Sequence, residues 1–360
     1  MSTAEREVAA YQTGFATGYS AGYTAASQRP QSCPIDVARV APALSNGLLD
    51  ARRTQTWAPN NVETADRTFQ YGVDAWMHRF LALEREVTRD EGPPRLTYVP
   101  VYASYIHIFY GHLKARAAHR YERLRLQRGV TYVVPHTHPG SCDGHTDGML
   151  RLQVDNDLCR SKRYVPVPYV VSHPAWLVAR TLPPRNRTRL LYFRGHLPKA
   201  QFDATQTRRK LLDALAREPG VRIEGANTLP GASYLPHDAY VEELLASTFC
   251  LAPRGDTASS KRLYEALAAG CIPVIVSDTL ELPFARQFDW TRLSVRVGEA
   301  EAAAAPHALV RRLRTMPPQQ VAAMQRYLLR HREAFLWHED ATRLSAPHYI
   351  RHELCAWAQV

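Results

Sequence analysis

The feature that most constrains the fold is one segment, Phe249–Asp278, which reads as a strand, a polar loop, a helix and a second strand. The buried-strand pattern FCLAP is followed by the loop RGDTASS and by a helix that is expected to begin near Ser259. Gly270 can end that helix in the left-handed conformation, and the apolar strand CIPVIVS follows at once. This order predicts a βαβ unit of a parallel sheet, and such sheets bind ligands at the carboxyl ends of their strands.

The loop of this unit has the chemistry expected of a diphosphate site. A helix amino end presents unpaired N–H groups and a partial positive charge, and both favour a phosphate. Hydroxyl groups and cationic side chains surround this helix end, and an arginine can donate two hydrogen bonds to one phosphate. Further along the helix, the carboxylate of Glu265 could accept both hydroxyls of a ribose. The candidate donor-site residues of this segment are Arg254, Thr257, Ser259, Ser260, Lys261, Arg262 and Glu265.

Arg194 is a further candidate for the same site. It follows the strand pattern LLYF and would emerge at the carboxyl end of a strand in the same half of the chain. For all of these residues a structural interpretation stays open. Serine and threonine often cap helices, Glu265 could lie on a solvated face, and Arg194 could be a surface residue at the start of a loop.

Strand and helix patterns alternate along most of the chain and predict an α/β fold with a parallel sheet covered on both faces. A polar, Pro-rich stretch at 182–188 separates two halves. The expected domains are a poorly ordered or appended segment over 1–60, a first domain over 61–182 and a second domain over 189–345. The clearest expected helices cover 64–85, 105–128, 207–217, 240–247, 259–269, 300–315 and 318–337, and the clearest strands 95–103, 130–135, 189–193, 221–223, 248–253 and 271–277.

The loop His136–Gly148, HTHPGSCDGHTDG, follows a strand of the first half and concentrates histidine and aspartate. Three interpretations stay open for it: a metal site, a general base that faces a cleft, or a polar surface loop. The histidines do not have the spacing of a helical metal-binding pair, and no metal ligand is assigned. The candidates for the general base are Asp143, His138 and His145, in no order.

The net charge of +11 favours an anionic partner such as a nucleotide diphosphate, an acidic polysaccharide, a membrane surface or nucleic acid. Basic residues around a surface helix explain much of this charge without any ligand. No recognition helix or aromatic RNA platform accompanies the charge, and nucleic acid is not expected as a partner.

Six cysteines give limited information about the compartment. The pair Cys142 and Cys159 lies in polar loops and could form a disulfide under oxidising conditions, whereas Cys250 and Cys271 lie in apolar runs and are expected to be buried thiols. No apolar run of about 18 residues or more predicts a transmembrane helix, and the N-terminus is not a recognisable secretory signal. On this basis the chain is cytoplasmic, or its targeting segment is missing.

The segment 249–297 resembles the core signature of exostosin-like glycosyltransferases. The matching stretches are LAPRGDTASSKRLYEALAAGCIPVIVSD, LELPF at 280–284 and FDWTRLSVRV at 288–297, and looser agreement extends over about 65–337. The resemblance implies two Rossmann-like domains (the GT-B fold) that face each other across a cleft. It also implies a nucleotide-sugar donor, a glycan acceptor and polysaccharide biosynthesis or protein glycosylation. Carried over by position, the donor-site candidates are Arg194, Arg254, Ser259, Ser260, Arg262 and Glu265.

The resemblance further implies an inverting enzyme, in which a UDP-sugar is the expected donor and no cofactor is required. In agreement with this, the position eight residues beyond Glu265 is Pro273, so the Glu-x7-Glu pair of many retaining two-Rossmann transferases is absent. Family members work in the Golgi and usually begin with a membrane anchor, which is not seen in this sequence. Homo- or hetero-oligomers are compatible with the sequence. The alternatives to an enzyme are an inactive glycan-binding module and a nucleic-acid-binding protein.

Overall fold

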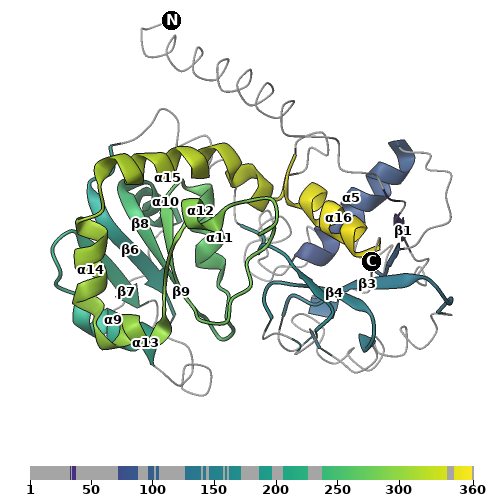
Figure 1. Ribbon diagram of the computed structural model, residues 1–360, viewed down its shortest axis with the longest axis horizontal. Coiled ribbons are helices and arrows are strands. Elements are labelled where there is room, and N and C mark those ends of the chain that lie inside the picture. Colours follow the sequence, from purple (N-terminus) through teal and green to yellow (C-terminus); the bar gives the residue numbers. More distant parts are fainter. Residues whose placement is uncertain are drawn as a thin grey trace, which may run out of the picture.

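In the computed structural model the described residues are 33, 35–37, 72–87, 96–100, 103–104, 126–138, 141–142, 146–156, 159, 162–171, 186–196, 206–225, 237–338 and 344–358. They form two α/β halves that lie side by side, each built on a five-stranded sheet (Figure 1). Every strand pair in both sheets is parallel. The predicted α/β class is confirmed, and the two parallel sheets are consistent with the two Rossmann-like domains expected.

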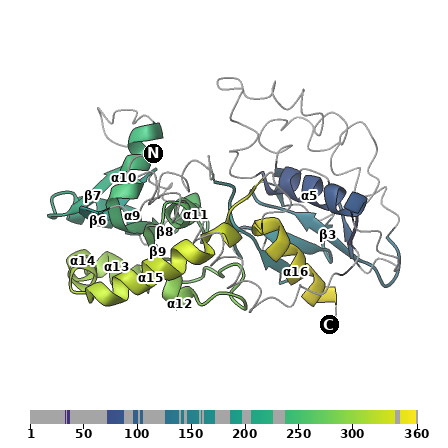
Figure 2. The ribbon, with the colours of Figure 1, turned by 90° about the horizontal axis from the view of Figure 1, so that it is seen from above.

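The first sheet has its strands in chain order. They are β1 (Ile35–Val37), β2 (Leu96–Tyr98), β3 (Thr131–Pro135), β4 (Leu150–Gln153) and β5 (Tyr164–Pro166). Helix α5 (Val73–Val87) packs on this half together with α16 (Ala346–Ala358), which returns from the C-terminal end of the chain (Figure 2). A disulfide between Cys33 and Cys355 joins the segment just before β1 to α16. Residues 33 and 35–37 are thus part of this half, although they lie within the segment 1–60 that is expected to be appended.

The second sheet has the order β10-β9-β8-β6-β7. Its strands are β6 (Arg189–Gly195), β7 (Val221–Gly225), β8 (Ser247–Pro253), β9 (Ile272–Val276) and β10 (Val295–Val297). One face is covered by α9 (Thr207–Leu215), α13 (Glu299–Ala304) and α14 (Pro306–Arg314), and the other by α10 (His237–Ala246) and α11 (Lys261–Ala268). The helices α12 (Trp290–Leu293), α15 (Pro318–His331) and η4 (Arg332–Phe335) complete this half.

Both faces of the second sheet are buried, because successive side chains of a strand point to opposite sides. In β8, Phe249 and Leu251 pack on the side of α9 and α14, while Cys250 and Ala252 pack on the side of α10 and α11. The apolar cluster on the side of α10 and α11 continues without a break into the core of the first half, where it includes Leu150. This cluster is therefore shared by the two halves, whereas the cluster on the side of α9 and α14 belongs to the second half.

The structure confirms the predicted βαβ unit and most of the predicted strands. Strands β1, β4 and β10 were not predicted, whereas β5 lies in 164–171, a Pro-interrupted segment that the sequence predicts to be extended. The predicted helix over 105–128 lies outside the described residues except at its end. The disulfide expected as an option between Cys142 and Cys159 is present. The prediction of buried free thiols at Cys250 and Cys271 is wrong, because these two residues form a third disulfide inside the core.

Gly270 ends α11 with a positive φ of 65°, as predicted. A Cβ atom there would lie 2.8 Å from Leu329 Cδ2 and 3.0 Å from Arg187 Nη2. We therefore expect Gly270→Ala to lower the free energy of unfolding by about 1–3 kcal/mol, measured by urea denaturation. Gly129→Ala is the matched control, since Gly129 has a φ of 82° and a Cβ added there would meet no atom within 4 Å. Equal losses in the two variants would show that the Leu329 contact is unimportant.

Candidate functional site

The strand order of the second sheet reverses between β6 and β8, which are neighbours although β7 lies between them in sequence. Such a switch point opens a crevice at the carboxyl ends of the two strands. Two of the predicted donor-site residues lie there: Arg194 near the end of β6, and Arg254 directly after β8. The backbone N–H of Arg254 donates to the Val276 carbonyl at 2.9 Å, which fixes the start of the loop 254–260 against β9.

Helix α11 begins at this crevice with Ser260 as its N-cap. The Ser260 hydroxyl makes no capping hydrogen bond, and its oxygen is buried without a partner among the described residues. An unpartnered buried hydroxyl at a helix amino end is available to a bound anion. The structural interpretation, in which this serine only caps the helix through its side chain, therefore does not hold for Ser260.

Glu265 lies one turn into α11 and is the centre of a buried charge cluster. Its carboxylate accepts hydrogen bonds from the Tyr240 hydroxyl at 2.6 Å and from Nη1 of Arg262, and Lys261 Nζ lies 3.3 Å away. Burial alone would raise the pKa of this carboxyl, but the charges of Arg262 and Lys261 and these hydrogen bonds outweigh burial and lower the pKa to about 2. Glu265 is 4% exposed, so it is not a solvated face residue.

Arg262 connects this cluster to the crevice. Its Nε donates to the Arg194 carbonyl at 2.6 Å, Nη1 donates to Glu265, and the guanidinium lies over the Tyr240 ring at 5.4 Å. The remaining terminal nitrogen, Nη2, makes no hydrogen bond to another described residue, and the side chain is 29% exposed. Three protein contacts thus orient the guanidinium and leave both N–H groups of Nη2 for a ligand.

Arg194 is held by the neighbouring strand. Its guanidinium pairs with Glu224 of β7, which also pairs with Arg222, and Arg222 reaches Glu243 of α10. The side chain of Arg194 is 15% exposed. Arg194 and Arg262 therefore meet at the end of β6, where the Arg194 carbonyl accepts a hydrogen bond from Arg262 Nε.

Asp155 is a site residue that the sequence did not indicate. It follows β4 of the first half, yet its carboxylate accepts hydrogen bonds from the Thr257 hydroxyl and from the Ser259 backbone N–H, the latter at 3.1 Å. Asp155 is fully buried. The loop predicted to hold a diphosphate is therefore anchored by a carboxylate from the other half, and two of its candidate donors are already occupied.

Arg208 of α9 is a second residue that sequence reasoning missed. Its guanidinium donates to the carbonyl of His196 at 2.7 Å and to the carbonyl of Pro253 at 3.2 Å. His196 directly follows β6, and Pro253 is the last residue of β8. It is 8% exposed. A buried arginine that joins the two strand ends fixes the width of the crevice between them.

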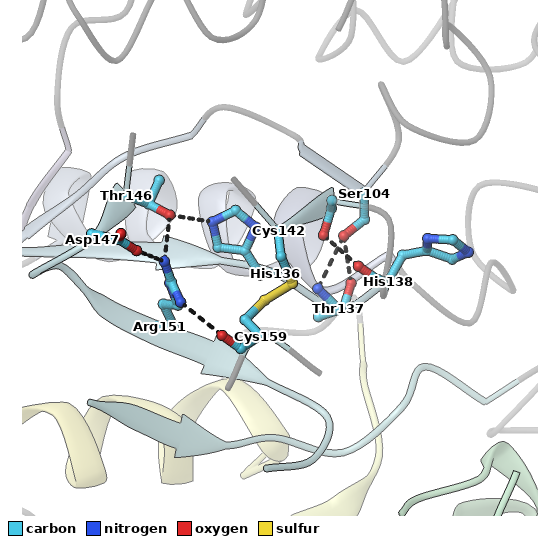
Figure 3. Close-up of a disulfide and its surroundings, with 10 residues drawn as sticks. Ser104, His136, Thr137, His138, Cys142, Thr146, Asp147, Arg151 and Cys159 are labelled. Atoms are coloured by element: carbon cyan, nitrogen blue, oxygen red, sulfur yellow. Dashed lines mark hydrogen bonds and ion pairs between the residues drawn. A yellow bond between two sulfur atoms is a disulfide. The ribbon is translucent and has the colours of Figure 1, made fainter. Parts of the chain in front are cut away.

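In the first half, Arg151 of β4 organises the loop that begins at His136 (Figure 3). Its Nη2 donates to the Thr146 hydroxyl at 3.1 Å and to Asp147 at 2.8 Å, and its Nη1 donates to the Cys159 carbonyl at 3.3 Å. His136 is buried and bonds to Thr146 through Nε2. Burial, together with the charge of Arg151, lowers the pKa of His136 to about 4, so this imidazole is neutral near pH 7.

The same loop carries the candidates for the general base. The disulfide between Cys142 and Cys159 ties it to the segment after β4, and the side chain of His138 points away from this cluster (Figure 3). Asp143 and His145 lie outside the described residues. Within the part of the chain that the structure describes, no group of histidine, cysteine and acidic side chains could hold a metal ion.

A comparison of the sequence with models of known protein families shows which family this chain belongs to. The model of the exostosin GT47 domain matches residues 37–313, which is most of the chain and covers both sheets except Ile35 and Asp36. The chain belongs to the exostosin GT47 family. The resemblance to exostosin-like glycosyltransferases is thereby confirmed.

Individual relatives of this exostosin GT47 chain include plant and animal proteins. It is 33% identical over 171 residues to the probable arabinosyltransferase ARAD1 of Arabidopsis thaliana, covering 48% of this chain and 36% of that protein. It is 46% identical over 70 residues to the exostosin-1 homolog of Caenorhabditis elegans, covering 19% and 18% of the two chains. It is 26% identical over 267 residues to the probable glucuronosyltransferase Os01g0926600 of Oryza sativa subsp. japonica, covering 64% and 61%. The exostosin GT47 chain thus spans less than two thirds of the length of these relatives.

Among the described helices of the exostosin GT47 chain, none is long and apolar enough to cross a membrane.

The buried charge of Glu265 predicts a specific dependence of stability on pH. The pKa of Glu265 is about 2 in the folded protein and about 4.3 in the unfolded chain. Its contribution to the free energy of unfolding is therefore complete above the unfolded pKa and is lost as pH falls through the folded pKa. We expect a contribution of about 3 kcal/mol at pH 7 and about half of it at pH 3. Urea denaturation of the wild type and Glu265→Gln across this range should show a steeper decline in the wild type. Glu301→Gln, on the exposed side of α13, is the control and should decline like the wild type.

Proposed function

We propose that this chain is an inverting glycosyltransferase that moves a sugar from a nucleoside-diphosphate sugar, expected to be a UDP-sugar, to a glycan acceptor. The observation that carries the proposal is the geometry at the switch point of the second sheet. There the unused Nη2 of Arg262 and the amino end of α11 converge at the ends of β6 and β8. Membership of the exostosin GT47 family and the names of the relatives, which include arabinosyl-, glucuronosyl- and xylosyltransferases, support it.

In this proposal the diphosphate lies at the amino end of α11. The Ser260 hydroxyl and Nη2 of Arg262 donate to its oxygens, and Arg254 and Lys261 contribute charge. Glu265 has two roles. In the structure it orients Arg262, and a contact with the donor's ribose would require one of its three protein partners to move. Glu265→Gln should accordingly weaken donor affinity more than it lowers turnover at saturating donor.

The acceptor would enter from the first half, so that the two Rossmann-like domains of the GT-B fold share the reaction. One base removes the proton of the acceptor hydroxyl as that oxygen attacks the anomeric carbon, and the nucleoside diphosphate leaves in the same step. His138, Asp143 and His145 remain the candidates for the base. Arg254, Arg262 and the helix amino end would stabilise the leaving diphosphate.

Direct displacement predicts inversion at the anomeric carbon. A donor with an α-linked sugar should give a β-linked product, because the acceptor attacks from the face opposite the leaving group. Proton NMR of the fresh product reports the anomeric configuration. An α-linked product would contradict the inverting assignment, and full activity in alanine variants of all three base candidates would remove this loop from the mechanism.

The three disulfides support an oxidising compartment as the place of action. We propose the lumen of the Golgi, the location that the resemblance implies.

A thermal-shift comparison with UDP, GDP and heparin tests the proposed function. Ligands that bind the folded state raise the unfolding temperature to an extent that grows with their occupancy. We expect UDP to raise it, GDP to raise it less, and heparin to have an effect that disappears at high salt. Stabilisation by heparin or DNA alone, without any effect of a nucleotide, would favour a polyanion-binding protein instead.

A further inference from the structure

A cavity of about 590 Å³ lies between the two halves, against the C-terminal helix. Its walls come from four segments: Asn156 after β4, the edge strand β5 with Lys162 just before it, the loop 281–286 after β9, and α16. Its volume is within the range of about 300–1,000 Å³ that is typical of small-molecule sites. None of the donor-site residues described above lines it.

The side chains around the cavity combine aromatic surface with balanced charge. Trp357 of α16 and Tyr164 of β5 are partly buried and supply aromatic surface. Lys162 and Arg286 supply two positive charges, and Glu281 and Glu353 supply two negative ones. The lining is therefore neutral, although the chain as a whole carries +11. A strongly anionic ligand would find no excess of positive charge here, and a lipid chain would find too many charged groups.

Two walls of the cavity are held rigidly. Glu353 accepts a hydrogen bond from Gln287 Nε2 at 2.6 Å, and the same amide nitrogen lies 2.9 Å from His352 Nδ1. In the loop 281–286, Phe284 has a positive φ of 58°, which is strained for a bulky residue. Its buried ring packs at 5.7 Å from Phe335 and 5.5 Å from Tyr349, and this packing offsets the strain. The loop therefore keeps a shape that an isolated segment would not adopt.

Asn156 is a polar residue in the wall of the cavity. Asn156 Oδ1 is buried and has no hydrogen-bond partner among the described residues. Such atoms normally find a partner, which here would be a donor of the ligand or a water molecule. Asn156 directly follows Asp155, whose carboxylate binds the loop 254–260. The cavity and the proposed donor site are thus joined by two consecutive residues.

We propose that this cavity binds a neutral oligosaccharide, and that it holds a part of the acceptor glycan away from the reacting hydroxyl. Sugar rings have an apolar face that packs on an aromatic ring, and hydroxyls that both donate to carboxylates and accept from cationic side chains. Those are the partners that Trp357, Glu353 and Arg286 offer. The role of this glycan as an acceptor rests on the proposed function. The binding of a neutral glycan in the cavity does not depend on that function.

The test is NMR of the indole N–H of Trp357 in the full-length protein, assigned by the loss of its signal in Trp357→Phe. The probes are neutral hexasaccharides of xylose, arabinose and glucose, with a heparin-derived hexasaccharide as the anionic comparison. We expect at least one neutral probe to shift this signal and the anionic probe to leave it in place. Arg286→Ala should raise the dissociation constant of that neutral probe about tenfold without affecting the fold, because Arg286 is exposed. Arg292→Ala, at an exposed arginine outside the cavity, is the matched control.

If no neutral probe moves the Trp357 signal, or if Arg286→Ala and Arg292→Ala behave alike, the inference is overturned. UDP binding is measured by calorimetry in the same samples to separate this result from the proposed function. A loss of oligosaccharide binding in Arg286→Ala with normal UDP affinity supports both. Oligosaccharide binding in a protein that does not bind UDP would leave the glycan site standing and contradict the transferase.

Discussion

Arg262→Ala should weaken the binding of UDP by about 5- to 150-fold, which corresponds to about 1–3 kcal/mol for a charge-assisted hydrogen bond. In the structure this guanidinium is fixed by the Arg194 carbonyl, by Glu265 and by the Tyr240 ring, and only Nη2 is left over for a ligand. The orientation of that nitrogen is therefore set before the nucleotide arrives. Isothermal calorimetry with UDP measures the effect directly.

The same substitution removes a partner from the buried carboxylate of Glu265, so a loss of stability must be separated from a loss of binding. Arg262→Lys keeps a positive charge near Glu265 but cannot donate to Arg194, Glu265 and a phosphate at once. It should bind UDP nearly as weakly as the alanine variant while remaining more stable. The control is Arg292→Ala, which removes an exposed arginine stacked at 4.0 Å over Tyr327 and should leave UDP affinity unchanged. Unchanged affinity in a folded Arg262→Ala protein would remove Arg262 from the donor site.

The double variant Cys33→Ser, Cys355→Ser should lower the free energy of unfolding by about 2–5 kcal/mol. This disulfide joins residues 322 positions apart and connects the start of β1 to α16. Without it, β1 is a three-residue edge strand held by its pairing with β2 and by the packing of Ile35 and Val37 on the core. Closing a long loop restricts the unfolded chain more than closing a short one does.

The matched comparison is Cys142→Ser, Cys159→Ser, which opens a disulfide with a sequence separation of 17. Urea denaturation should show a smaller loss for this pair, of about 3 kcal/mol or less. A larger loss for the short pair would indicate that the contacts of the loop 136–148, and not the restriction of the unfolded chain, dominate the stability.

The second half was predictable from the sequence because its signals are local. Apolar runs mark β8 and β9, a Ser-rich loop precedes α11, and Gly270 follows it, so the βαβ unit could be identified. The strand β4, with the sequence LRLQ, was missed because Arg151 and Gln153 are polar and yet buried. The partners of Arg151 are loop groups that only the folded chain brings near.

The contacts that the sequence could not provide are long-range. Asp155 reaches Thr257 across 102 positions, and no local pattern marks the aspartate as a partner of that loop. Cys250 and Cys271 were predicted as thiols because each lies in an apolar run. Their pairing depends on how the strand β8 and the turn after α11 are placed relative to each other. The sequence predicts a ribose contact for Glu265, and the structure adds three protein partners, of which Tyr240 comes from α10, a helix that the local pattern could not position.

The most direct test of the central proposal is a transfer assay read by mass spectrometry. The protein is incubated with UDP-arabinose, UDP-xylose, UDP-glucuronic acid or UDP-glucose and with neutral oligosaccharide acceptors, and the acceptor masses are measured. We predict that one donor adds the mass of a single sugar residue, and that Arg262→Ala slows this gain at donor concentrations that just saturate the wild type. If UDP binds with the expected dependence on Arg262 but no donor yields a heavier acceptor, the chain is a glycan-binding module, and the proposal of a transferase is contradicted.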